Sequence, residues 1–170
     1  MQACVDAGAD VVIDKAARGA DAFWDEARTV APEGYIAIFD ANGVSTLQQS
    51  YEHLALCGRL IIYGFHSNLP RGIHTLNPFA WLKMAFLISR MPKFDPMALV
   101  LESKAVLGFN LSFFAEETDL IADYMEQIRQ WVDSRKIKPL AVTAFPLEEA
   151  AAAHSSIQSG SSIGKIVLTT

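Results

Sequence analysis

The feature that most constrains this chain is a pair of apolar runs that each end in glycine. Residues 36–43 (IAIFDANG) form the first run and residues 59–64 (RLIIYG) form the second. Residues 44–58 between them carry apolar side chains at helical spacing, which predicts a helix that Gly58 ends. A strand, a crossover helix and a strand make a βαβ unit with two parallel strands. Ligands of open parallel sheets bind beyond the carboxyl ends of the strands, which directs attention to Ala41-Asn42-Gly43 and Gly64-Phe65-His66.

The rest of the chain is predicted to alternate between strands and helices. Strands are predicted at residues 9–14, 104–113, 137–145 and 165–170, and helices at residues 1–7, 20–30, 79–89, 97–103, 116–135 and 146–157. Ser45 with Gln48 predicts a capping box for the helix of the βαβ unit. Asn77 followed by Pro78 predicts the start of the next helix. Gly108 inside a strand suggests the close approach of a backbone or a ligand.

Composition excludes several classes of partner. The 170 residues are 51% hydrophobic and carry a net charge of −5, which suits one globular domain with a core of its own. Positive charge does not cluster, so neither nucleic acid nor an anionic membrane is an expected partner. The start of the chain has no signal-peptide pattern, and its two cysteines lie far apart. We therefore expect a cytoplasmic protein with reduced, structural cysteines.

The predicted helix at residues 79–89 is apolar nearly all round. It is too short to span a membrane, which takes about 20 residues. A helix of this kind has to be covered on several sides. Contact with the core or with a second copy of the chain is favoured over lining a hydrophobic substrate cleft.

Single residues with chemical potential each have a plainer interpretation. His66 could act as an acid or base, but a solvated loop histidine is the favoured reading. No His or Cys lies at metal-ligand spacing from His53, His74 or His154, so no metal site is predicted. Asn110 lies on an otherwise apolar strand and would need a partner if buried, either a carboxamide or a neighbouring backbone group. No catalytic residue can be assigned.

These segments, in this order, resemble a known family. The matching segments are GADVVID, IAIFDANG, LALCGRLIIYG, VLGFNLSF, KIKP, FPLEEAAAAHSSIQSG and IGKIVL. They are similar to the C-terminal half of a medium-chain dehydrogenase/reductase. The greatest similarity is to the zinc-independent quinone oxidoreductases, in the branch that resembles the synaptic vesicle membrane protein. The resemblance covers essentially the whole chain.

The resemblance implies an α/β fold, a partial Rossmann domain with a doubly wound, mainly parallel sheet that binds NADPH. Its strands 3, 4, 5 and 6 correspond to ADVVID, IAIFDA, RLIIYG and VLGFNL. The first strands and the Gly-rich phosphate loop of the family have no counterpart in this sequence. The implied cofactor contacts are Ala41, Asn42, Gly43, Gly64, Phe65, Phe109, Asn110 and Leu111. The implied domains are a partial dinucleotide-binding domain, 1–136, and a segment, 137–170, that in the family returns to the GroES-like catalytic domain.

The implied activity is hydride transfer from NADPH to a quinone or an enone. Without the phosphate loop and the catalytic domain, we expect weak or absent NADPH binding and little turnover by this chain alone. Two strands would separate strand 3 from strand 4 in the family order. We therefore expect strand 3 to join a four-stranded sheet, to leave the sheet, or to be bridged by a second copy. The apolar edge at strand 6 predicts a homodimer. The alternatives are a non-enzymatic domain acting in dimerisation or assembly, and an unrelated α/β binding module.

Overall fold

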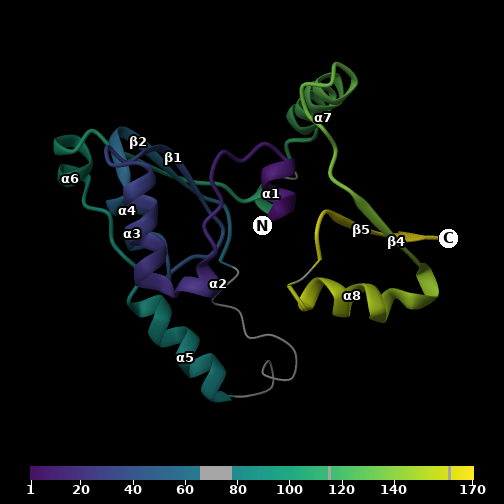
Figure 1. Ribbon diagram of the computed structural model, residues 1–170, viewed down its shortest axis with the longest axis horizontal. Helices are drawn as coiled ribbons and strands as arrows, with labels where there is room; N and C mark the ends of the chain where they lie inside the picture. Colours follow the sequence, from purple (N-terminus) through teal and green to yellow (C-terminus); the bar gives the residue numbers. More distant parts are fainter. Residues whose placement is uncertain (66–77, 115, 161) are drawn as a thin grey trace. The chain divides into compact units, whose positions relative to one another are not determined.

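The chain forms two compact units. The computed structural model describes residues 1–65, 78–114, 116–160 and 162–170, and only the backbone of residues 16, 18 and 20 (Figure 1). One unit comprises residues 11–114, and the other comprises residues 1–10 together with 115–170. Both contain parallel β-strands and helices, which confirms the predicted α/β class. The predicted domain boundary between residues 136 and 137 stays a prediction.

The unit of residues 11–114 is built on a three-stranded parallel sheet in the order β1-β2-β3. Its strands are β1 (Tyr35–Asp40), β2 (Leu54–Ile62) and β3 (Ala105–Gly108). A short helix, α4 (Leu47–Glu52), lies in the crossover between β1 and β2. The crossover is close to the minimum of about a dozen residues that two parallel strands require. The predicted βαβ unit is therefore present.

The helix of this unit is much shorter than predicted. β2 already begins at Leu54, where the sequence predicted helix up to Gly58. Two residue steps along β1, from Tyr35 to Ala37, correspond to five along β2, from Leu54 to Arg59. This bulge absorbs the extra residues, and Cys57 within it has a φ of 61°. Pairing with β1 thus overrides the helical spacing of the local sequence.

The predicted capping box is also wrong. Thr46 takes the N-cap position of α4, and its hydroxyl group does not bond to the start of the helix. It donates to the carboxylate of Asp40 instead. Gln48 bonds to Glu52 one turn along the helix. The crossover is held by the end of β1 rather than by a reciprocal cap.

The core of this unit lies on one face of the sheet. Leu47, Leu54 and Leu60 are buried together, and Leu60 on the central strand is 0% exposed. His53 joins this layer to α3 (Ala20–Val30), a helix that matches the prediction to the residue. The two ring nitrogens of His53 lie 2.8 Å from the carbonyl oxygen of Gln49 and 3.2 Å from that of Trp24. The Trp24 ring also packs on the imidazole, with 4.8 Å between centroids.

The predicted strand at residues 9–14 is not present. Residues 9–14 pair with no strand of the described chain, although Ile13 lines a cavity together with residues of β1. Of the three expected outcomes, this segment has left the sheet. A strand is stable only with a partner to complete its hydrogen bonds, and no described strand occupies the place next to it. The short helix α2 (Lys15–Arg18) follows it directly.

Strand β3 is shorter than predicted and ends at Gly108. Residues 111–113 form a 3₁₀ turn, η2 (Leu111–Phe113), which begins at Asn110. The side-chain oxygen of Asn110 accepts a hydrogen bond from the Ser112 backbone N–H at 3.0 Å. Asn110 is therefore an exposed turn residue rather than a buried strand residue. A Cβ atom at Gly108 would meet no described atom within 4 Å, so no neighbouring backbone approaches it closely, and the approach of a ligand stays a prediction.

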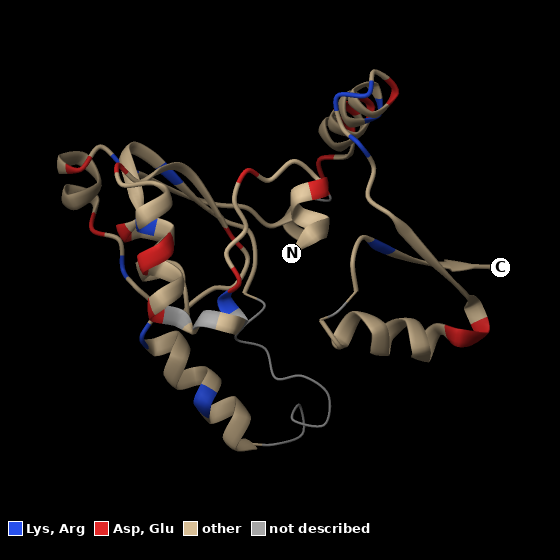
Figure 2. Cartoon of the chain, in the orientation of Figure 1, with Lys and Arg blue, Asp and Glu red and all other residues tan. Residues whose placement is uncertain are grey.

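Two further helices of this unit agree with the prediction. They are α5 (Pro78–Ser89) and α6 (Pro96–Leu101). The Asp95 side chain caps α6 by accepting from the Met97 N–H at 3.1 Å. No residue of α5 is buried by the described chain, and the helix carries almost no charge (Figure 2). The predicted cap at Asn77, the candidate His66 and the metal alternative at His74 lie outside the described residues.

The second unit contains a smaller βαβ arrangement. Strands β4 (Val142–Pro146) and β5 (Lys165–Thr169) pair in parallel, and helix α8 (Ala150–Gln158) connects and contacts them. The 3₁₀ turn η3 (Leu147–Glu149) precedes α8. The short helix α1 (Gln2–Asp6) and the longer α7 (Thr118–Asp133) complete the unit. No helix of the described chain is long and apolar enough to cross a bilayer.

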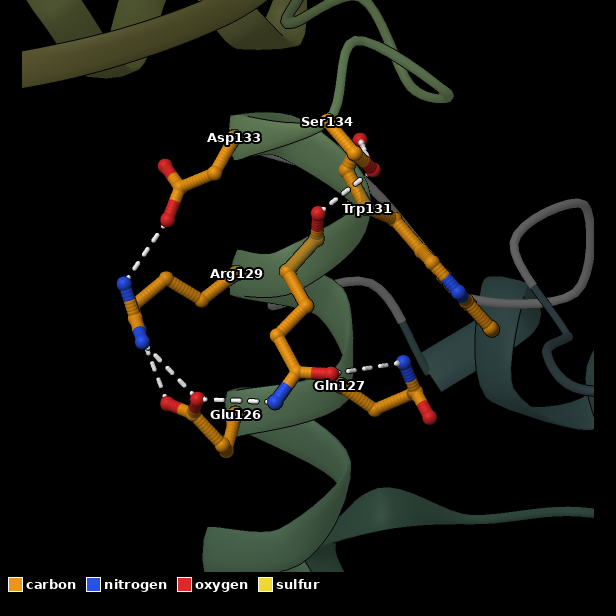
Figure 3. Close-up of polar contacts among 7 residues, drawn as sticks. Glu126, Gln127, Arg129, Trp131, Asp133 and Ser134 are labelled. Atoms are coloured by element: carbon orange, nitrogen blue, oxygen red, sulfur yellow. Dashed lines mark hydrogen bonds and ion pairs between the residues drawn. The ribbon is translucent and has the colours of Figure 1, made fainter.

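The exposed face of α7 carries a connected polar network (Figure 3). The Arg129 guanidinium donates to both carboxylate oxygens of Glu126 at 2.8 Å and to Asp133 at 2.7 Å. Gln130 donates to Glu126 at 3.0 Å. The bond from Arg129, followed by that from Gln130, lowers the pKa of Glu126 to about 2. The network holds consecutive turns of the predicted helix together.

Candidate functional site

The carboxyl ends of the three strands lie at one edge of the sheet, as the parallel order requires. The ladder continues past the strands into the turns. The Tyr63 N–H donates to the carbonyl oxygen of Asp40, and the Phe109 N–H donates to that of Ile62. The predicted site residues after β1, β2 and β3 therefore follow one another along this edge.

The turn after β1 is organised by the Asp40 side chain. This carboxylate is 3% exposed and lies at the last position of the strand. It accepts hydrogen bonds from the backbone N–H groups of Asn42 at 2.8 Å and Gly43 at 3.1 Å. The hydroxyl groups of Thr46 and Ser50 add bonds of 2.7 and 2.8 Å. Gly43, with a φ of 91°, adopts the left-handed conformation that this tight turn needs.

The turns after β2 and β3 enclose a cavity of about 450 Å³. Four predicted residues line it together, namely Gly64, Phe65, Phe109 and Asn110. Ile62, Tyr63, Gly108 and Phe113 also line it, and the ring centroids of Phe109 and Phe114 lie 6.3 Å apart. Residues 62–65 and 108–113, which are more than 40 positions apart in the sequence, thus line the same cavity.

The chemistry of this cavity suits a flat, uncharged group. None of the described residues that line it is charged, and aromatic rings form much of its wall. Aromatic faces stack on planar rings, and open backbone at Gly64 and Gly108 allows close approach. A nicotinamide ring fits this description, whereas the phosphates of a dinucleotide need cationic groups or free N–H groups. These residues could thus hold the nicotinamide end of NADPH.

A second cavity, of about 320 Å³, lies beside β1. Its apolar side is formed by Phe23, Trp24 and Ala37, and its polar end by Asp40 and Asn42. The Tyr35 hydroxyl group also lies here and donates to the carbonyl oxygen of Ala27 at 2.8 Å. Burial raises the pKa of the Tyr35 phenol. Lys15 and the hydroxyl groups of Thr46 and Ser50, both bonded to the Asp40 carboxylate, also line this cavity.

The described residues do not fit a metal centre. No group of three His, Cys, Asp or Glu side chains in the described chain is placed to hold a metal ion. His53 is buried between two carbonyl oxygens, and the thiols of Cys4 and Cys57 are exposed and separate. The expected structural burial of the two cysteines is therefore wrong. Cys57 is exposed because it lies in the bulge of β2.

The predicted site residues fall into two groups. Gly64, Phe65, Phe109 and Asn110 share one cavity, whereas Ala41, Asn42 and Gly43 form the Asp40-bound turn. Leu111 lies in the 3₁₀ turn and is 60% exposed, away from the lining of either cavity. Whether any of them contacts a cofactor stays a prediction.

The residue that the sequence reasoning missed is Asp40. Its signal was present, because an acidic residue ends an apolar strand just before Asn-Gly and is followed by hydroxyl residues. Such a carboxylate commonly accepts from backbone N–H groups one or two residues on. The sequence predicts a turn at Asn42-Gly43, and the Asp40 carboxylate is the group that closes it.

Comparison with known proteins places the chain in a family. The family described as "Zinc-binding dehydrogenase" matches residues 7–168. A synaptic vesicle membrane protein VAT-1 homolog of Danio rerio is 30% identical over 146 residues, which are 86% of this chain and 29% of the relative. The corresponding human protein is 26% identical over 85% of this chain and 35% of its own length. The chain thus spans about a third of the length of the curated relatives it matches.

Solved structures agree with this assignment. A mycobacterial protein in complex with NADPH has a TM-score of 0.67 at 25% identity, covering 98% of this chain and 44% of its own. A human VAT-1 homolog-like protein has a TM-score of 0.56 at 23% identity, covering 85% and 36%. A Pseudomonas syringae quinone oxidoreductase has a TM-score of 0.58 at 16% identity, covering 86% and 39%. The chain therefore belongs to the medium-chain dehydrogenase/reductase family, with VAT-1-like relatives of which it spans about a third.

Proposed function

We propose that this chain is the nicotinamide-side portion of the NADP-binding domain of an NADPH-dependent quinone or enone oxidoreductase. The observation that carries the proposal is the uncharged aromatic cavity formed by Gly64, Phe65, Phe109 and Asn110 at the carboxyl edge of the sheet. That edge is where open parallel sheets bind ligands. Membership of the family and the likeness to a protein solved with NADPH support the choice of cofactor.

In this proposal the bound cofactor supplies the hydride that reduces the conjugated carbonyl. The chain contributes position and exclusion of water rather than acid–base chemistry. Phe109 and Phe113 offer faces against which a planar ring packs, and Gly64 offers backbone at close range. Asp40 is bound by the chain's own donors and is not available as a general base. The proposal needs no zinc and suits a protein of the cytoplasm.

Direct titration tests the cofactor assignment. We expect NADPH to bind weakly, with a saturable change in nicotinamide fluorescence. The variant Gly108→Val should weaken this binding at least tenfold, because a side chain there enters the cavity without meeting other atoms. Leu56→Ala, at an exposed position of β2 outside the cavity lining, is the control. No saturable change up to about 1 mM NADPH would contradict a cofactor site in this chain.

Turnover gives a separate result. The pure chain should oxidise NADPH with a quinone at a negligible rate, because no described residue lining the cavity carries a carboxylate, imidazole or ammonium group, and the Tyr63 phenol is the one ionisable side chain among them. A steady, protein-dependent rate that Gly108→Val abolishes would show that the chain is a complete catalyst. That outcome would refute the proposed inactivity while supporting the proposed site.

A second candidate function is assembly without catalysis, in which the chain forms homodimers. The observation that favours it is α5, which exposes Phe79, Leu82 and Phe86 at 77%, 68% and 58%. Burying such side chains stabilises association by about 1.5–3 kcal/mol each when burial is complete. Light scattering at micromolar concentration should give the mass of a dimer, and the double variant Leu82→Glu/Phe86→Glu should give that of a monomer. A wild-type monomer would contradict this candidate.

A further inference from the structure

The carboxylate of Asp40 occupies the turn after β1 and acts there as an anion that belongs to the chain. Four donor groups converge on the Asp40 carboxylate, namely the N–H groups of Asn42 and Gly43 and the hydroxyl groups of Thr46 and Ser50. The bond lengths run from 2.7 to 3.1 Å, and the carboxylate is almost completely buried.

The two backbone donors matter most for ligand choice. Successive backbone N–H groups in a turn form the concave sites that bind phosphate and other anions in many proteins. Here both groups already donate to Asp40, so neither is available to a ligand phosphate. It would also approach a carboxylate of the same charge.

We propose that Asp40 is a specificity-determining residue that closes the turn of residues 41–43 to anionic groups. An uncharged part of a ligand, such as a nicotinamide or a ribose, is then favoured over a phosphate against the backbone of this turn. Lys15 lines the cavity beside it, so the exclusion applies to the turn itself and not to the whole cavity. The identity of that ligand rests on the proposed function, but the exclusion of anions does not. The carbonyl oxygen of Asp40 also accepts from the Tyr63 N–H at 3.0 Å, so the same residue fixes the adjacent turn before Gly64.

A purely structural role for Asp40 predicts something different. If the carboxylate only stabilised the crossover, its removal would weaken the fold and create no new affinity. If it fills an anion-binding turn, its removal should leave a vacancy that a small carboxylate can enter. Gain of anion binding is therefore the decisive measurement.

The test uses the full chain labelled with ¹⁵N. In Asp40→Ala, formate at up to about 100 mM should produce saturable shifts of the Asn42 and Gly43 amide resonances, against equal concentrations of sodium chloride. Hydrogen exchange at both amides should be about tenfold faster than in the wild type, and formate should slow it. The wild type and Asp40→Asn, which keeps an acceptor oxygen in place, should not respond. Ser50→Ala, which loses one donor but keeps the carboxylate, should not respond either.

Two outcomes would overturn the proposal. One is an Asp40→Ala chain that folds, as judged by its dispersed amide spectrum, yet shows no formate-dependent change at Asn42 and Gly43. The other is a saturable response of these two amides in the wild type to inorganic phosphate, which needs no variant to fold. Neither measurement contains NADPH, so both are independent of whether the cofactor binds.

Discussion

Gly34→Ala should be among the most destabilising single substitutions in the three-stranded unit. Gly34 has a φ of +84° and lies directly before β1. A Cβ atom there would lie 2.6 Å from the Ala55 nitrogen and 2.8 Å from the Leu54 carbonyl carbon. Both atoms belong to the backbone of β2 and pair next to Tyr35. They cannot move away as the end of a flexible side chain would.

Two terms set the expected loss of stability. The left-handed backbone costs roughly 1–2 kcal/mol for a residue with a Cβ atom. Overlap in a packed region costs about 1–3 kcal/mol more. The sum, about 2–5 kcal/mol, is a large part of the roughly 5–15 kcal/mol that stabilises a typical protein. In urea, followed by circular dichroism, the midpoint should fall by about 1–2.5 M at a mid-range slope of about 2 kcal/mol/M.

Two other glycines of the same unit separate these terms. Gly19 has a φ of +79° and a ψ of 168°, a conformation that residues with a Cβ atom rarely adopt, but open space around it, so Gly19→Ala should lose about 1–3 kcal/mol from backbone strain alone. Gly108 has neither constraint, and Gly108→Ala should change stability by less than about 0.5 kcal/mol. If Gly34→Ala cost no more than Gly19→Ala, the close approach to Ala55 would not constrain the fold.

Three further predictions follow from single contacts. Leu60→Ala, at a 0% exposed position on the central strand, should lower the free energy of unfolding by about 2–5 kcal/mol in urea titrations, while Leu56→Ala, 72% exposed, should change it little. Arg129→Ala should return the pKa of Glu126 from about 2 towards 4.5 in carboxyl NMR titrations. Because the pKa of Glu126 is lowered in the wild type, its contribution to helix stability is present above pH 4.5 and is lost as the pH falls towards 2. An unchanged titration would show that the pair does not persist in solution. Asp95→Ala should destabilise α6 by about 1 kcal/mol, seen as faster hydrogen exchange in its first turn, and equal exchange would exclude a capping role.

Helices whose signals are local could be predicted closely. The Ala20–Val30 helix follows from a break at Gly19 and from apolar spacing within one segment, and its observed bounds match the prediction. The α7 helix, Thr118–Asp133, lies within the predicted residues 116–135. For both, the sequence that forms the helix also contains the residues that begin and end it.

Elements that depend on a distant partner could not be predicted from the sequence. Leu54 and Ala55 fit a helical face in the local pattern, but Leu54 pairs with Tyr35, and that contact decides for strand. Residues 9–14 have the composition of a buried strand, yet composition does not supply the neighbouring strand that such a segment requires. Asn110 is a different case, because its side chain accepts from the Ser112 N–H only two residues along, a local turn that competes with the apolar strand pattern around it.

The candidate site was predictable as far as strand topology fixes it. Parallel strands bring their carboxyl ends together, and Gly64, Phe65, Phe109 and Asn110 share a cavity for that reason. The full role of Asp40 could be read only from the structure, because its donors come from four residues after the strand, namely Asn42, Gly43, Thr46 and Ser50. The sequence marks where a turn lies but not which of its donors are already engaged.

The bulge in β2 also fixes the alignment of the sheet. A regular pair of strands can slip by two residues and still keep the same side chains on each face. Here Tyr35 pairs with Leu54 and Ala37 pairs with Arg59, so two residue steps along β1 face five along β2. Cys57 lies within the bulge with a φ of 61°, a conformation that regular strand pairing does not allow. Any slip of the register would place Cys57 in a regularly paired position. β1 and β2 can therefore pair in only one register. Insertions in the crossover between β1 and β2 should therefore lengthen the loop and leave the pairing of the sheet as it is.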